Sequence, residues 1–171
     1  NAIADKYIVY RSQLINGSWS DWTKVTTTTG SDVSATDTGV LSGETYKYSV
    51  RVAKESDYSY RKASSSLIFL GQPELKTSNI EVGIKGTWSL VDGATGYAIY
   101  REEYNPSTKK YGNKLHLGTT GATTKSFTDK SAKPGVKYSY TIVAINGSAS
   151  SVASSASKLW RLTQPEVTIS V

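Results

Sequence analysis

The stretch Thr95-Gly96-Tyr97-Ala98-Ile99-Tyr100-Arg101 decides the fold, because a close copy of it occurs earlier in the chain. The copy is Asp5-Lys6-Tyr7-Ile8-Val9-Tyr10-Arg11, ninety positions upstream. Both stretches are rich in aromatic and aliphatic residues, which suit the half-buried surface of a β-sheet. A period of this length exceeds that of a solenoid unit and matches the size of one β-sandwich domain. The repeat therefore predicts two sandwich domains in tandem.

Two further matches extend the repeat and place its boundary. Gly43-Glu44-Thr45-Tyr46-Lys47-Tyr48 corresponds to Gly135-Val136-Lys137-Tyr138-Ser139-Tyr140, and Leu70-Gly71-Gln72-Pro73-Glu74-Leu75 corresponds to Leu162-Thr163-Gln164-Pro165-Glu166-Val167. The proline in the second pair has no backbone N–H and therefore ends a strand. We place the boundary at Gln72-Pro73 and divide the chain into module one (residues 1–72), module two (73–164) and the start of a third module or tail (165–171).

Module two has the pattern of a complete sandwich. Ile80, Val82 and Ile84 alternate with polar residues or glycine, which is the period of a strand. Asp92-Gly93 and Asn146-Gly147 are turn signals that separate neighbouring strands. No segment shows a helical period. Short alternating strands with turns between them predict an all-β, immunoglobulin-like fold for both modules.

Module one lacks the opening part of this pattern. Only six residues precede Tyr7, whereas 24 residues, counted from Pro73, precede Tyr97 in module two. We therefore expect module one to lack its two N-terminal strands. The segment Val33-Ser34-Ala35-Thr36 would then have unpaired backbone groups, and such edges recruit strands from other chains. We expect strand complementation by preceding residues on a separate chain, or by a strand swapped from a neighbouring copy, such as Val167-Thr168-Ile169-Ser170-Val171.

Three motifs resemble bacterial fibronectin type III repeats. They are Gly86-Thr87-Trp88, Gly93-Ala94-Thr95-Gly96-Tyr97-Ala98-Ile99-Tyr100-Arg101 and Ser131-Ala132-Lys133-Pro134-Gly135-Val136-Lys137-Tyr138. The resemblance covers all of module two and most of module one. It implies that Trp88 is the family's core tryptophan on the second strand. It also implies a tyrosine corner, in which the Tyr138 hydroxyl bonds to the backbone just upstream, with Tyr46 in the same role in module one.

No constellation in the sequence supports catalysis. The chain has no cysteine, which excludes disulfides and thiolate chemistry. His116 is its only histidine and is expected to face outward from a short strand, and one histidine without cysteine does not make an ordinary zinc site. Glu102 and Glu103 are neighbours on a strand end and point to opposite faces, so they cannot share acid–base work. We predict no enzyme activity, no metal and no cofactor.

Aromatic side chains are the first candidate ligand-binding residues. Trp19 and Trp22 lie three positions apart, which on a continuous strand predicts opposite faces, with one ring packed and the other partly exposed. Tyr58 and Tyr60 share a face if their segment is extended. An exposed flat ring stacks on a sugar or a peptide. The alternative is that these side chains have no ligand: the tyrosines are ordinary strand residues, and the rings pack at the edge of the sheet.

Lysines are the second candidate. The net charge is +6, and residues 72–171 hold 12 basic and 7 acidic residues. Lys109, Lys110 and Lys114 lie on the long hairpin loop that follows Arg101. Such an excess favours an acidic partner, such as an anionic glycan or wall polymer. The alternative is solubilising surface charge, and the basic and aromatic residues are too weakly interleaved to predict nucleic-acid binding.

These features predict non-catalytic spacer and adhesion modules of a larger secreted or cell-surface bacterial protein. The partners would be neighbouring domains of the same polypeptide, with weak contacts to a glycan, a cell-wall polymer or a surface protein. The alternative is a dedicated binding module for carbohydrate or an anionic polymer. No apolar run approaches the roughly 20 residues of a membrane-spanning helix, so we expect no membrane span. The spacer and adhesion role implies an extracellular or cell-surface location.

Overall fold

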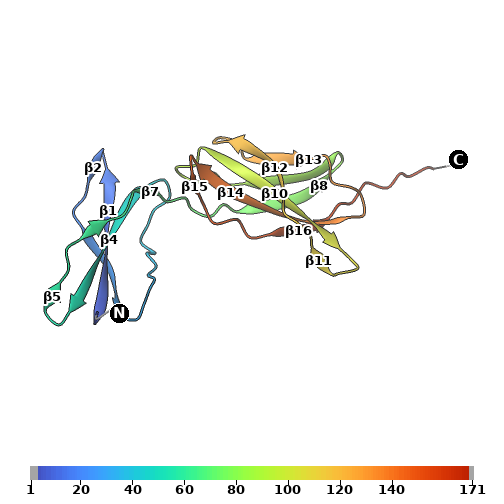
Figure 1. Cartoon of the computed structure of the whole chain (residues 1–171). Coiled ribbons are helices and arrows are strands. Elements are labelled where there is room, and N and C mark those ends of the chain that lie inside the picture. Colours follow the sequence, from blue (N-terminus) through green and yellow to red (C-terminus); the bar gives the residue numbers. More distant parts are fainter. Residues whose placement is uncertain (1–3, 170–171) are drawn as a thin grey trace. The chain divides into compact units, whose positions relative to one another are not determined.

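The computed structural model describes residues 4–169, and β-strands are the only regular secondary structure among them. The chain forms two compact units, Asn1–Phe69 and Leu70–Val171 (Figure 1). All strands of module one lie in the first unit, and all strands of module two lie in the second. The all-β fold predicted from the repeat is therefore confirmed.

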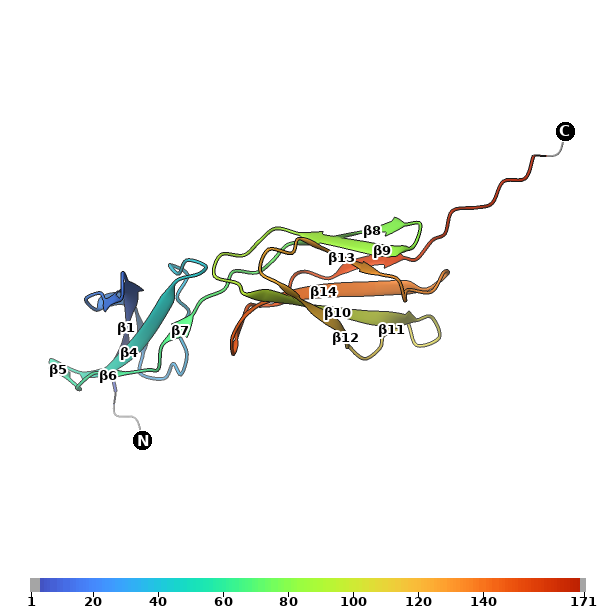
Figure 2. The ribbon, with the colours of Figure 1, turned by 90° about the horizontal axis from the view of Figure 1, so that it is seen from above.

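Module two is a sandwich of two antiparallel sheets (Figure 2). One sheet has three strands in the order β13-β9-β8, and the other has six, built on the central pair β10 and β14. Phe127 and Ile84 meet Tyr140 between the sheets. The strands are β8 (Leu75–Ile80), β9 (Gly83–Trp88), β10 (Gly96–Asn105), β11 (Lys110–Tyr111), β12 (Leu115–Gly121), β13 (Ser126–Asp129), β14 (Lys137–Asn146), β15 (Ala149–Ser150) and β16 (Ser157–Trp160).

Trp88 lies at the end of β9 and faces the core, as expected. It is 5% exposed. Its ring centroid lies 5.4 Å from that of Tyr97 on the opposite sheet and 6.2 Å from that of Phe127. Tilted aromatic contacts at these distances add to the free energy gained by burying each ring. Trp88 therefore connects the two sheets at one end of the sandwich.

Both expected tyrosine corners are present. The Tyr138 hydroxyl accepts a hydrogen bond from the backbone N–H of Lys133 at 3.0 Å, and the Tyr46 hydroxyl accepts one from Leu41 at 3.0 Å. Each corner turns through a glycine with positive φ, Gly135 at 76° in module two and its counterpart in module one at 87°. The same turn therefore forms in module one although Ser42 stands where module two has a proline.

Module one is a single seven-stranded sheet built on β1 and β4. Its register repeats that of module two, because Tyr7 pairs with Val52 as Tyr97 pairs with Ala144. A register shift follows Val9 in β1, and one follows the matching residue of β10. The strands are β1 (Lys6–Ile15), β2 (Ser18–Trp19), β3 (Thr23–Thr29), β4 (Thr45–Lys54), β5 (Asp57–Tyr58), β6 (Lys62–Ala63) and β7 (Leu67–Ile68).

No second sheet covers module one within residues 4–169. The chain between β3 and β4 runs beside the sheet instead (Figure 1), and residues 33–36 are exposed and belong to no strand. The proposed donor tail ends outside the described residues, and residues 165–169 are exposed and irregular. Module one is therefore an open half-sandwich in this chain.

Trp88 allows a matched test of core packing. Replacing Trp88 by alanine is expected to destabilise module two by about 3–5 kcal/mol, because the change leaves a cavity between the sheets. Trp160→Ala is the control, since that ring is 48% exposed and its loss should cost far less. Urea denaturation of both variants measures the difference. Equal losses of stability would contradict the central place of Trp88.

Candidate functional site

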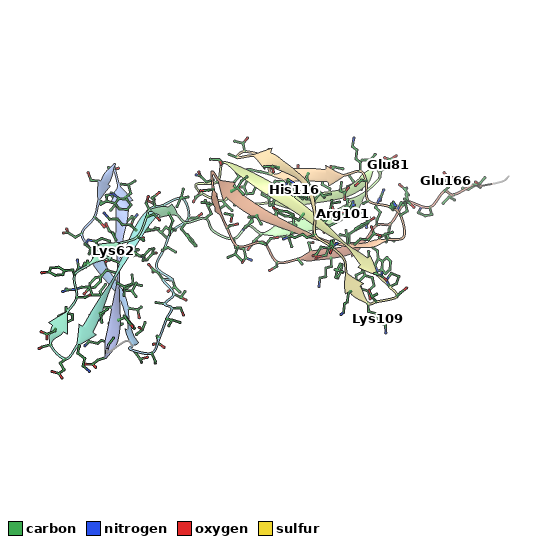
Figure 3. The ribbon with its side chains drawn as sticks, viewed as in Figure 1. Lys62, Glu81, Arg101, Lys109, His116 and Glu166 are labelled. Atoms are coloured by element: carbon green, nitrogen blue, oxygen red, sulfur yellow. The ribbon has the colours of Figure 1, made fainter. Side chains whose placement is uncertain are left out.

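Three ionisable groups with perturbed pKa values, Arg101, Asp129 and Tyr140, lie together inside module two. Asp129, at the end of β13, accepts hydrogen bonds through Oδ2 from Arg101 Nη1 on β10 and from the Tyr140 hydroxyl on β14, each at 2.7 Å. Ser131 donates its N–H and hydroxyl to Oδ1. Burial alone would raise the pKa of Asp129, but the bonds from Ser131, Tyr140 and Arg101 lower it. Figure 3 shows Arg101 within the body of module two.

Module one repeats this arrangement on its own sheet. Arg11 Nη1 lies 3.0 Å from Asp37 Oδ2, and the Tyr48 hydroxyl donates to the same oxygen at 3.0 Å. Burial, followed by the bond to Asp37, raises the pKa of Tyr48 to about 12. We call each set of arginine, aspartate and tyrosine a triad. The ion pair of this triad is more exposed than its counterpart, with side-chain exposures of 21% for Arg11 and 12% for Asp37 against 12% and 3% in module two.

These triads have the chemistry of structural ties rather than of a catalytic site. Each carboxylate is saturated by donors, so neither is free to take a proton from a substrate. Residues 4–169 contain no group of three or more histidine, cysteine, aspartate or glutamate side chains placed to hold a metal ion. His116 is exposed, as expected, and its ring lies 5.2 Å from that of Tyr100.

Trp19 and Trp22 lie around one ammonium group, and the prediction that they occupy opposite faces is wrong. Lys47 Nζ lies 4.2 Å from the Trp19 ring centroid and 5.4 Å from that of Trp22. The strand assumption failed because β2 ends at Trp19 and β3 begins at Thr23, so the intervening residues do not follow a strand's alternation. Ser20 instead folds back, its hydroxyl accepting from the N–H of Gln13.

The row of stacked cations continues beyond the two tryptophans. Arg61 Cζ lies 4.2 Å from the Tyr10 ring centroid and 6.0 Å from that of Trp22. We call Trp19, Lys47, Trp22, Arg61 and Tyr10 the cation–aromatic row. Cation–aromatic contacts in exposed positions contribute about 0.5–1 kcal/mol each. The row covers the outer face of the sheet, opposite the face that carries Tyr48.

The other predicted binding residues do not join this row. Tyr58 is half-exposed on β5, with the Arg51 guanidinium 5.0 Å from its ring centroid. Tyr60 is fully exposed and lies outside any strand. The extended segment on which the two tyrosines were expected to share a face therefore stops at Tyr58. Their role in binding stays a prediction.

The three lysines of the long hairpin occupy different positions on it. Lys109 is exposed at the tip of the β10–β11 hairpin (Figure 3), and Lys110 begins β11. Lys114 instead lies against the sheet, with Nζ 4.5 Å from the Tyr100 ring centroid. Their role in binding also stays a prediction.

The first and last strands of module two are tied together by side chains. The Asn79 amide on β8 donates to Trp160 O at 2.8 Å and accepts from the N–H of Leu162 at 2.9 Å. The buried Arg161 guanidinium donates to Ile80 O at 3.0 Å and to Glu81 O at 2.8 Å. The Thr77 and Ser157 hydroxyls meet at 2.7 Å. We call Asn79, Arg161, Thr77 and Ser157 the end clamp.

Sequence reasoning missed both the triads and the end clamp. The triads had a signal, since arginine, aspartate and tyrosine recur at matching positions of the repeat, as Arg11, Asp37 and Tyr48 in module one. The end clamp had no such signal, because the pair Asn79 and Arg161 is not repeated in module one and its members are 82 positions apart. Only the closing of the sheets brings those two segments side by side.

The two triads allow a matched comparison of buried and exposed ion pairs. Asp129→Asn is expected to destabilise module two by about 3 kcal/mol, because it leaves the largely buried Arg101 without its charge partner. Asp37→Asn should cost less, because water reaches Arg11. Since the pKa of Asp129 is lowered by folding, its contribution is present above pH 4 and is lost as acid protonates the folded carboxylate. Denaturation at neutral and acid pH checks this, and a penalty for Asp129→Asn that does not shrink in acid would contradict it.

Comparisons with known proteins agree with this architecture. A family model described as "Fibronectin type III domain SaeA third domain" matches residues 73–159, just over half of the chain. A two-domain fibronectin type III segment of chicken tenascin covers 92% of this chain and 85% of its own length, at 18% identity and a TM-score of 0.51. The FN5 domain of Drosophila Lar covers 56% of this chain and 99% of its own, at 18% identity and a TM-score of 0.46.

No similar sequence was found among curated proteins. At such low identity the likeness to tenascin shows the fold alone, whereas the family model matches the sequence itself across module two. The core tryptophan Trp88 and the tyrosine corner at Tyr138 occupy the places that the fold requires. The chain therefore belongs to the fibronectin type III family.

Proposed function

We propose that these modules are non-catalytic spacer and adhesion units of a larger secreted or cell-surface bacterial protein. They position neighbouring domains of the same polypeptide and make weak protein or glycan contacts. Family membership supports this reading, because such domains commonly serve as spacers or adhesion modules. Residues 4–169 contain no helix of the length and apolarity needed to cross a membrane.

The end clamp is the observation that carries the spacer proposal. Its contacts advance in the same direction along both strands, because Thr77 meets Ser157 and Asn79 meets Trp160 and Leu162. The first strand and the last strand therefore run parallel where they touch. Tension applied at the two ends of module two would slide these strands past each other and strain every contact at once. Simultaneous loading makes such an arrangement resist extension better than contacts that open one by one.

The burial of Arg161 adds to this resistance. The side chain is buried, and its two terminal nitrogens reach two successive carbonyls at the turn between β8 and β9. The planar guanidinium matches two acceptors at fixed positions, which a lysine ammonium cannot do. Removing it would leave the Ile80 and Glu81 carbonyls without these donors. We therefore expect Arg161 to matter more than the exposed Asn79.

Single-molecule force spectroscopy on the whole chain, held between flexible handles, tests the spacer proposal. The double variant Asn79→Ala with Arg161→Ala should unfold module two at clearly lower force than the unmodified chain, because the two end strands lose their ties. At equilibrium, Arg161→Ala should cost about 1–3 kcal/mol. Asn113→Ala, an exposed loop residue, is the control and should leave the force unchanged. An unaltered unfolding force in the double variant would argue against a mechanical role.

A second candidate function is binding of an anionic polymer by the cation–aromatic row. Lys47 and Arg61 have no acidic partner within salt-bridge distance among residues 4–169. Their charges are therefore available to carboxylate or sulfate groups. The same stacking covers part of the Trp19 and Trp22 rings, which disfavours a neutral sugar on those faces. Lys109 and Lys110 would add attraction at the module-two hairpin.

Isothermal titration with heparin and with neutral dextran tests this candidate. Binding by the row should occur with heparin alone and weaken as salt shortens electrostatic reach to about 8 Å at physiological ionic strength. Arg61→Ala should reduce the affinity more than Lys62→Ala, although the two changes remove the same charge (Lys62 is labelled in Figure 3). Equal effects of the two variants, or affinity that ignores salt, would exclude the row as a binding site.

A further inference from the structure

Module one has the inner face of a sandwich without a sheet to cover it. Val50 and Val52 are 47% and 38% exposed, whereas Ile142 and Ala144, at the same register positions of module two, are fully buried. Two adjoining hollows of about 360 and 440 Å³ lie on this face, and Ala35 and Val50 line both. We call these hollows the inner groove.

Residues 34–37 form one edge of the groove, at the place where module two has the paired strand β13. By the repeat, residues 34–37 correspond to β13, which pairs along its whole length with β9 in module two. Residues 34–37 pair with no strand among the residues that the structure describes. Asp37 holds this segment to Arg11 and Tyr48 just as Asp129 holds β13. The groove therefore has a backbone edge that is positioned before any partner arrives.

We propose that the inner groove binds a two-stranded antiparallel β-hairpin from outside residues 1–171, with one strand of the hairpin pairing along residues 34–37. Module two supports this choice, because its equivalent face is covered by the β8–β9 hairpin. A second copy of this chain cannot supply that hairpin without opening its own core, where Ile84 and Trp88 are buried. The tail that begins at Pro165 offers a single strand only, which leaves half of the face uncovered.

The lining of the groove defines the chemistry of the guest. Its charged members are Asp32 and Asp37. The first accepts from the N–H of Thr29 at 2.8 Å, and the second is paired with Arg11. Beside Asp37 the inward face of the hairpin must therefore be uncharged, because a charge buried there would find no free partner. Over Tyr7, the counterpart of Tyr97, an inward tryptophan would find the same aromatic neighbour that Trp88 has in module two.

At one sequence position we expect the hairpin that binds module one to differ from β9. In module two, a Cβ atom added to Gly86 would meet the Phe127 ring at 2.1 Å, so only glycine fits there. The residue of module one that corresponds to Phe127 is Ala35, which has no ring. A glycine in the guest would leave a void beside Ala35. We therefore infer that the hairpin recognised by module one carries a branched aliphatic residue at the position equivalent to Gly86.

Two synthetic peptides test this inference against the whole 171-residue chain. One has the sequence of residues 73–90, and the other has the same sequence with Gly86→Val. Isothermal titration should show the valine peptide binding with one-to-one stoichiometry and at least about tenfold more tightly, because it fills the void beside Ala35. Valine also favours the extended backbone, which could by itself make the peptide bind more tightly. The chain variant Ala35→Phe separates this effect from the filling of the void. In that variant the glycine peptide should become the better ligand.

Location is checked with two lysine substitutions at similarly exposed sites. Val50→Lys places a charge in the groove and should abolish binding, whereas Leu115→Lys, at a residue 51% exposed in module two, should leave it intact. Methyl resonances of Val9 and Val52 should shift on titration. The proposal would be overturned if neither peptide bound the chain. It would also be overturned if the valine peptide remained the better ligand of the Ala35→Phe variant. Self-association of the chain that disappears when residues 165–171 are removed would likewise overturn it, since the groove would then take the tail of a second copy.

Discussion

A carboxylate held between an arginine and a tyrosine connects the layers of this fold. In module two Asp129 ends a strand of the three-stranded sheet, while Arg101 and Tyr140 belong to the two central strands of the six-stranded sheet. Burying an ion pair costs desolvation energy that only good geometry and further hydrogen bonds can offset. The serine at position 131 and the Tyr140 hydroxyl supply those bonds. The tie therefore fixes both the spacing of the sheets and the start of the tyrosine corner that follows.

The same tie persists in module one without the sheet that it would normally secure. Asp37 holds the segment before the corner at the edge of an apolar face, and the corner tyrosine Tyr46 is as well buried as its counterpart. What module one lacks is cover for Val50 and Val52. Its two faces are consequently unlike: the outer face carries stacked cations and rings, and the inner face offers aliphatic side chains and a free backbone edge. This asymmetry underlies both the polymer-binding and the hairpin-binding proposals.

The proposed mechanical and binding roles draw on different parts of the chain. The end clamp uses residues at the two limits of module two, and it joins the two sheets through side-chain-to-backbone bonds and the Thr77–Ser157 hydroxyl pair. The cation–aromatic row uses residues of three strands and two connecting segments of module one. The proposed roles therefore rest on surface chemistry and strand geometry.

The sequence by itself determined the all-β class and the repeat, since these follow from the alternation around Tyr97 and its copy at Tyr7. Its resemblance to fibronectin type III repeats also predicted the burial of Trp88 and the corner at Tyr138. Tertiary structure alone decided that Trp19 and Trp22 share Lys47, because the three residues between β2 and β3 leave the extended path. It alone brought Asn79 to Arg161 and its neighbours, since residues far apart in the chain meet only when the strands pair and the sheets close. The local pattern of residues predicts on which face of the sheet a side chain lies. Its contacts with side chains of other strands depend on strand register and on the fold as a whole.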